Sequence, residues 1–237
     1  MMPERAWIPV ALSHVIEAGT SAGALIDGAE LVVWRDRKGT AHIWEDRCPH
    51  RGMRMSFGFV RGDHIACLYH GWQYDAAGQC RHIPAHPDLE VPATIRIATY
   101  AAEERNGIIW TCLAEDADIA GIPDAAGTAT PVRSLYVDCS METAAAALAR
   151  ASLPVEGGPD EPAAVAELLP GSWLLCAGAT RIMIAAQPVN RGKIALHIVL
   201  IDAPGGSALP KAVARWAAAL RLRLEAIPAP IATPEYA

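Results

Sequence analysis

The chain has 237 residues, of which 52% are hydrophobic and 19% charged, so it can fold around an apolar core and is not intrinsically disordered. Its formal net charge is −6 and it has no long basic run, which argues against nucleic acid as a partner. No stretch is apolar enough to cross a membrane and no export signal opens the chain, so we expect a cytoplasmic protein.

The first half of the chain has the pattern of an all-β domain. Residues 31–34 and 41–44 are mostly apolar and rich in β-branched residues and tryptophan, and the Lys38-Gly39 pair between them predicts a hairpin turn. Further short strands are expected at residues 58–60, 65–68, 95–100 and 108–113.

A change of composition separates the two halves. Between Ala114 and Pro131 the sequence becomes rich in Ala, Asp, Gly and Pro and has no periodicity, which is typical of a linker. We therefore expect two domains, at residues 1–115 and 116–237.

The second half predicts an antiparallel sheet with helices. Ser140 is a suitable N-cap for an alanine-rich helix that runs to about Ala151. Strands are expected at residues 134–138, 172–177, 181–187 and 193–201. A closing helix is predicted by one apolar stripe, formed by Leu209, Val213, Trp216, Leu220 and Leu224. The fold class of the whole chain is thus α+β.

Two short motifs carry the clearest chemistry. The chain has six cysteines, and without an export signal metal binding or burial explains them better than disulfides. Cys48-Pro49-His50 and Cys67-Leu68-Tyr69-His70 together supply two thiolates and two imidazoles. A Rieske [2Fe-2S] cluster requires this set, because two cysteines hold one iron and two histidines hold the other.

A zinc site is the main alternative for these residues. Mononuclear zinc sites usually separate paired ligands by at least two residues, whereas one residue separates Cys48 from His50. With this spacing the two ligands can reach different irons of one small cluster. We therefore predict Cys48, His50, Cys67 and His70 as the ligands of a [2Fe-2S] cluster.

The two motifs also carry a family resemblance. Residues 46–53 and 67–75 resemble the N-terminal domain of Rieske non-haem iron oxygenase α subunits, and the similarity extends from Trp7 to Trp110. The resemblance implies a low reduction potential. Met53 and Tyr69 stand where respiratory-type Rieske proteins have two further cysteines, and Trp72 stands where high-potential members have a serine that donates to the cluster.

Charge around the two motifs suggests how a redox partner is attracted. Residues 47–81 contain five arginines and two aspartates, whereas the rest of the chain is acidic. This basic collar could steer an acidic electron donor, although arginines that solvate a loop-rich surface explain it equally well. The collar arginines are Arg47, Arg51, Arg54, Arg61 and Arg81.

The second half lacks a pattern that the resemblance implies. The related oxygenases have a helix-grip domain that holds a mononuclear iron through two histidines and a carboxylate. Beyond Ala114 this sequence has one histidine, His197, and residues 140–171 look like a shortened version of the segment that would carry the ligands. We therefore expect no mononuclear iron and assign no catalytic residue. An iron bound here would depend on carboxylates such as Asp138, Glu142, Glu156 and Asp160.

Three functions follow from this sequence. The first is electron transfer: the chain takes electrons from a reductase or ferredoxin and passes them to a catalytic oxygenase subunit, most simply within an oligomer. The second is a divergent oxygenase that itself oxygenates or demethylates a small organic substrate, with iron bound by carboxylates, His197 or a neighbouring subunit. The third is a structural or redox-sensing subunit. None of the three involves nucleic acid or a membrane.

Overall fold

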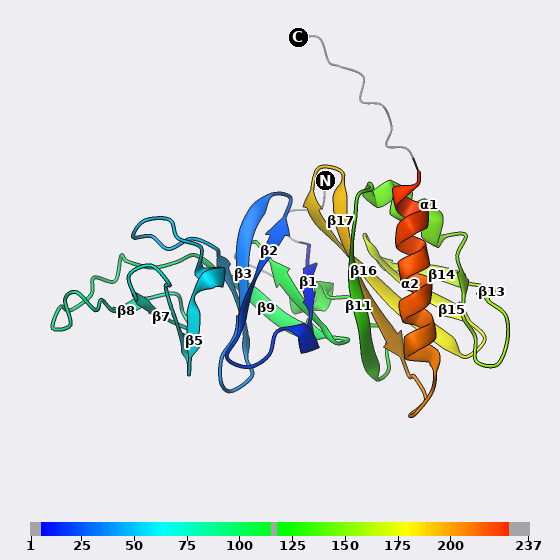
Figure 1. Ribbon diagram of the computed structural model, residues 1–237, viewed down its shortest axis with the longest axis horizontal. Helices are drawn as coiled ribbons and strands as arrows, with labels where there is room; N and C mark the ends of the chain where they lie inside the picture. Colours follow the sequence, from blue (N-terminus) through cyan, green and yellow to red (C-terminus); the bar gives the residue numbers. More distant parts are fainter. Residues whose placement is uncertain (1–5, 115–117, 228–237) are drawn as a thin grey trace, which may run out of the picture.

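A computed structural model describes residues 6–114 and 118–227 of the chain. The fold is α+β, as expected, and these described residues form three main antiparallel sheets and two α-helices (Figure 1). A small four-stranded sheet lies at one end of the molecule, a six-stranded sheet lies in the middle, and a five-stranded sheet with the helices forms the other end (Figure 1). None of the helices in the described ranges has the length and hydropathy that a membrane span needs.

The six-stranded sheet is built from the two ends of the N-terminal half. Its order is β1-β10-β9-β4-β3-β2. Side chains alternate across it: Leu31 and Val33 of β3 face one core with Val10, whereas Val32 and Trp34 face a second core beneath the cysteine loops. Its strands are β1 (Ile8–Leu12), β2 (Ser21–Ile26), β3 (Ala29–Arg35), β4 (Ala41–Glu45), β9 (Thr99–Arg105) and β10 (Ile108–Cys112), and the short 3-10 helix η1 (Ser13–Val15) follows β1.

The four-stranded sheet is inserted between β4 and β9; the first cysteine motif lies in the loop that leads into it, and the second lies at the turn between β6 and β7. It consists of β5 (Phe59–Arg61), β6 (His64–Ala66), β7 (Gln73–Asp75) and β8 (Cys80–His82), preceded by the 3-10 helix η2 (Met55–Phe57). Ile65, Tyr74 and Ile97 are buried beneath the loops together with Trp34 and Met55. This apolar core fixes the position of the loops above it.

The C-terminal half forms the five-stranded sheet in the order β11-β17-β16-β15-β14. One face of this sheet is covered by α1 and α2, and all five residues of the predicted stripe on α2 are buried there. The elements are η3 (Ile119–Gly121), β11 (Ala129–Val137), α1 (Met141–Leu148), β12 (Ser152–Leu153), β13 (Glu161–Pro162), β14 (Ala164–Leu169), β15 (Ser172–Ala177), β16 (Thr180–Asn190), β17 (Lys193–Ile201) and α2 (Leu209–Glu225).

The other face of this sheet packs against the N-terminal half. Met183 and Val199 form one apolar cluster with Leu12 and Trp110. Two backbone hydrogen bonds also cross the boundary, from Asp27 N to Pro188 O and from Gly28 N to Val189 O, each 2.9 Å. The C-terminal sheet therefore lies between two layers, with the helices on one face and the N-terminal half on the other.

Several predicted elements require correction. The strand expected at residues 95–100 is β9, Thr99–Arg105, because Ile97 turns inward to the core beneath the loops. The strand expected at 65–68 ends at Ala66, where the cysteine turn begins. The helix expected to reach Ala151 ends at Leu148, although Ser140 caps it as predicted, accepting from Thr143 N at 3.1 Å.

Some strands were not expected at all, among them β2 and β14. The sequence of β2, Ser-Ala-Gly-Ala-Leu-Ile, has one β-branched residue, and its pairing with β3 makes it a strand. The expected linker is shorter than predicted, since β11 begins at Ala129. The proposed boundary at residue 115 falls on residues 115–117, which lie outside the described residues.

Candidate metal centre

The first cysteine loop follows β4 and closes on itself through two backbone hydrogen bonds. Cys48 N donates to Met53 O at 2.8 Å, and Gly52 N donates to Cys48 O at 2.8 Å. Gly52 has a φ of +72°, a conformation that side chains rarely adopt, so glycine suits this position. The loop is a tight turn that buries Cys48, which is 2% exposed, and leaves His50 partly exposed.

The second loop, between β6 and β7, repeats this geometry. Cys67 N donates to Trp72 O at 2.9 Å, and Gly71 N donates to Cys67 O at 3.0 Å. Gly71 has a φ of +70°. The histidine is the second residue after the cysteine in the first loop but the third in the second loop. One backbone turn is thus used twice, with the imidazole at different places on it.

The two loops bring the four predicted ligands together as two pairs. Cys48 and Cys67 are both buried, whereas the imidazole rings of His50 and His70 lie nearer the surface with centroids 4.6 Å apart. Burial raises the pKa of the Cys67 thiol and the neighbouring Cys48 raises it further, so iron binding would displace a proton here. Partial burial, His70 and Arg51 lower the pKa of His50, which favours the neutral imidazole that binds metals.

This donor set fits a Rieske cluster, with two thiols inside and two imidazoles outside. All six cysteines are free thiols in the structure. In the described ranges, no three His, Cys, Asp or Glu side chains lie close enough together to hold a single metal ion.

Aromatic rings hold the outer edge of the site in place. The Trp72 indole stacks on the His50 imidazole with centroids 4.3 Å apart and an interplanar angle of 4°. The Tyr69 ring lies 3.9 Å from the His70 ring, and Tyr69 is 56% exposed. Trp72 thus restricts the orientation of His50, while Tyr69 and His70 form an open aromatic surface.

Tyr74 is a site residue that the sequence does not single out. Its hydroxyl lies 3.2 Å from Cys48 Sγ, in the buried core beneath the loops. Burial, followed by the neighbouring Cys48, raises the pKa of Tyr74 far above its usual value, so the hydroxyl keeps its proton. Toward a Cys48 thiolate it must donate, and such a bond favours a reduced cluster. The signal in the sequence was the alternation of β7, which turns Tyr74 inward between Gln73 and Asp75.

The basic collar is weaker than the arginine count suggests. Arg54 forms an ion pair with Glu30, and Arg81 forms one with Asp75 at 2.5 Å. Arg47, Arg51 and Arg61 are exposed.

The residues considered for a second iron do not converge. His197 is 1% exposed and shares a face of the C-terminal sheet with Val199, on the side of the N-terminal half. The carboxylates named above are exposed: Glu142 on the opposite, helix-bearing side, Glu156 and Asp160 in a loop, and Asp138 paired with Lys193 at 3.2 Å. The layer between sheet and helices is filled instead by apolar side chains such as Leu148, Leu153 and Trp216. These residues do not fit a facial triad.

Comparisons with known proteins agree with the arrangement of the two cysteine loops. Residues 6–100 match the Rieske [2Fe-2S] domain family. Over 110 residues, which is 46% of this chain and 19% of the relative, the sequence is 38% identical to Oxidoreductase NdmD of Pseudomonas putida. It is 37% identical over 106 residues to the 3-chlorobenzoate-3,4-dioxygenase oxygenase subunit of Comamonas testosteroni, covering 44% of this chain and 24% of the relative. The alignment thus spans about a fifth to a quarter of these relatives.

The fold matches over a longer span. Dicamba monooxygenase bound to dicamba superposes with a TM-score of 0.77 at 19% identity, covering 94% of this chain and 87% of that one. A mutant of NdmA from Pseudomonas putida with theobromine gives a TM-score of 0.74 at 19% identity, covering 98% and 85%. The chain therefore contains a Rieske [2Fe-2S] domain, whose cofactor is a Rieske-type [2Fe-2S] cluster, and it is similar to Rieske oxygenase α subunits in the sequence of that domain and in fold over most of its length.

Proposed function

We propose that this chain is the electron-transfer component of a Rieske oxygenase system. In this proposal Cys48 and Cys67 hold the inner iron of the cluster, and His50 and His70 hold the outer one. The cluster supplies a reversible one-electron centre. The two cysteine turns bury the thiols, Trp72 orients His50, and the Tyr74 hydroxyl donates to Cys48 Sγ.

The observation that carries the proposal is the position of the imidazole pair near the surface, with His70 exposed and His50 partly exposed. His70 and its neighbour Tyr69 are exposed, so a redox partner can approach the outer ligands directly. The small sheet that carries the loops lies at the opposite end of the molecule from α1 and α2 (Figure 1). We infer that electrons enter from a reductase or ferredoxin and leave through this surface to a catalytic iron in another chain.

The alternative, an oxygenase in its own right, is supported by the extent of the fold match. The fold of this chain superposes on most of dicamba monooxygenase and of NdmA. The sequence is also 42% identical, over 33% of this chain, to the methylxanthine N1-demethylase NdmA of Pseudomonas putida. In that case a further iron would bind in the C-terminal half or at a contact with another subunit.

Iron content and spectroscopy distinguish the two functions. The full chain is loaded anaerobically with iron and sulfide, then incubated with additional Fe(II) and desalted. Electron transfer alone predicts two irons and two acid-labile sulfides per chain, and no high-spin signal in electron paramagnetic resonance after addition of nitric oxide. A third iron that gives a high-spin nitrosyl signal, lost in His197→Ala, would replace the proposal by the oxygenase alternative.

A further inference from the structure

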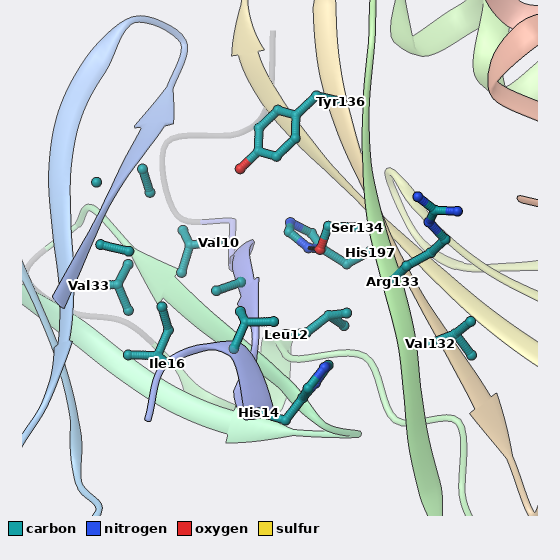
Figure 2. A pocket seen from close by; sticks show the side chains of 15 residues that line it. Val10, Leu12, His14, Ile16, Val33, Val132, Arg133, Ser134, Tyr136 and His197 are labelled. Atoms are coloured by element: carbon teal, nitrogen blue, oxygen red, sulfur yellow. Dashed lines mark hydrogen bonds between the residues drawn. The ribbon is translucent and has the colours of Figure 1, made fainter. Parts of the chain in front are cut away.

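A hollow of about 390 Å³ lies where the two halves of the chain meet. It is bounded by β1, η1, β2 and β3 on one side and by β11 on the other (Figure 2). Its N-terminal wall is mostly apolar and includes Val10, Leu12, Ile16 and Val33, with His14 as its one imidazole. Small-molecule sites typically have a volume in this range, mostly apolar walls and a position at an interface between structural units.

One wall of the hollow is polar and is formed by a chain of hydrogen bonds. Ser134 Oγ lies 2.8 Å from His197 Nδ1, and His197 Nε2 lies 2.9 Å from Gln187 Oε1. Gln187 Nε2 in turn donates to the backbone carbonyl of Leu25 at 2.8 Å. Ser134 and His197 line the hollow, and Figure 2 shows them side by side.

The Leu25 carbonyl, at one end of this series of hydrogen bonds, determines which group donates and which accepts in each of them. The Leu25 carbonyl can only accept, so the amide nitrogen of Gln187 faces it and the amide oxygen faces His197. His197 therefore carries its proton on Nε2 and accepts at Nδ1. Burial lowers the pKa of His197 to about 4, so the ring is neutral at pH 7. Ser134 must then donate its own proton to His197.

This arrangement decides what the hollow can recognise. With its proton committed to His197, the Ser134 oxygen presents only lone pairs to the hollow, so it accepts hydrogen bonds and does not donate them. The Tyr136 hydroxyl points toward the same space (Figure 2). Arg133 is turned away, and its guanidinium donates to Ala214 O of α2 at 3.3 Å, so it does not provide a counter-ion for an acid (Figure 2).

We propose that this hollow is a binding site for a small, uncharged, mostly apolar molecule that carries a hydroxyl or N–H group, which donates to Ser134 Oγ. The apolar body of the ligand lies against Val10, Leu12 and Val33. The site does not involve the cluster loops and is independent of the proposed electron transfer.

Three probes of one shape test this specificity with the cluster-loaded protein. They are 2-naphthol, which has a donor, 2-methoxynaphthalene, which does not, and naphthalene-2-carboxylate, which is charged. Affinities are measured by ligand-observed NMR and calorimetry at pH 7. We expect 2-naphthol to bind about two to ten times more tightly than its methyl ether, as one hydrogen bond provides, and the carboxylate to bind most weakly. Equal affinities for the alcohol and the ether, or no binding of 2-naphthol, would overturn the proposal.

Two variants locate the binding. Ser134→Val replaces the hydroxyl by a methyl group that also covers His197 Nδ1, and it should reduce the affinity for 2-naphthol to that for the ether. Ala24→Leu, on the β2 wall, fills the hollow and should abolish binding of both probes. Ala166→Leu, an exposed strand alanine on β14, is the matched control and should bind like the wild type. Unchanged 2-naphthol binding in folded Ala24→Leu, judged by circular dichroism and cluster absorbance, would place the ligand elsewhere and contradict the proposal.

Discussion

The cysteine loops and the layer between the C-terminal sheet and its helices differ in the kind of side chain that their backbone positions. In the loops, two turns with the same hydrogen bonds bring two thiols and two imidazoles together, with the thiols buried and the imidazoles nearer the surface. In the C-terminal layer the corresponding interior is occupied by Trp216, Leu148 and Leu153. A fold similar to that of oxygenase chains thus combines a group of proposed metal ligands at one end with an apolar layer beneath the helices at the other.

The two faces of β17 show the same contrast within one strand. Leu196, Ile198 and Leu200 point to the helices, whereas His197 points to the N-terminal half and joins the bond chain to Leu25. Successive side chains of a strand point to opposite faces of the sheet. A shift of one position would therefore move the titratable side chain from one face to the other. His197 is therefore a residue of the boundary between the halves.

The largest effect is expected at the cluster loops. Cys48→Ser should abolish the visible absorbance of the cluster, because it removes a proposed inner ligand that a serine does not replace well. The matched control is Cys176→Ser on β15, which should keep full absorbance. Absorbance and iron per chain are compared after identical loading. An intact spectrum in Cys48→Ser would contradict the assigned ligands.

The C-terminal layer is tested by its buried tryptophan. Trp216 is 5% exposed, and its indole nitrogen donates to Ser152 O at 2.7 Å. Trp216→Ala should lower the free energy of unfolding by about 3–5 kcal/mol, through lost burial and a cavity. Leu222 on the same helix is 70% exposed, and Leu222→Ala should change this free energy by less than about 0.5 kcal/mol. Urea denaturation measures both, and equal effects would show that the layer is not tightly packed.

The boundary between the halves should be sensitive to acid. His197 has a pKa of about 4 in the folded chain and about 6.5 when exposed on unfolding, so between these values the unfolded chain binds one more proton. Stability should therefore fall as the pH falls, by about 2 kcal/mol from pH 7.5 to pH 5.

The His197→Gln variant isolates this contribution. Glutamine cannot be protonated in this range, so the variant should lose about 2 kcal/mol less than the wild type over the same pH interval. Urea denaturation at both pH values provides the comparison. Parallel losses in the two proteins would show that His197 does not titrate as its burial implies.

A smaller effect is expected from the buried hydroxyl beneath the loops. Tyr74→Phe removes the donor to Cys48 Sγ and should lower the reduction potential of the cluster, because the bond stabilises the more negative, reduced form. Tyr136→Phe removes the hydroxyl of a tyrosine on β11 of the C-terminal sheet and is the control. Protein-film voltammetry measures both, and an unchanged midpoint in Tyr74→Phe would exclude Tyr74 as a donor to the cluster.

Local patterns in the sequence determined much of this molecule. The two cysteine motifs, the hairpin of β3 and β4, the strands β15 and β17 and the stripe of α2 all depend on residues close together in the chain, so composition and periodicity predict them. The proposed ligand set of the cluster could also be derived from the sequence, because metal chemistry demands particular donor atoms at short spacings.

Only the tertiary structure decided which distant residues meet. Tyr74 contacts Cys48 across 26 residues, and Gln187 bonds Leu25 across 162 residues, and no local rule fixes either pair. Strand periodicity places His197 on one face of β17, but which layer covers that face depends on how the two sheets pack. Weak strands such as β2 likewise form because a neighbouring strand pairs with them. The sequence thus specifies the chemistry of the cluster loops, whereas long-range packing creates the hollow between the halves and its polar wall.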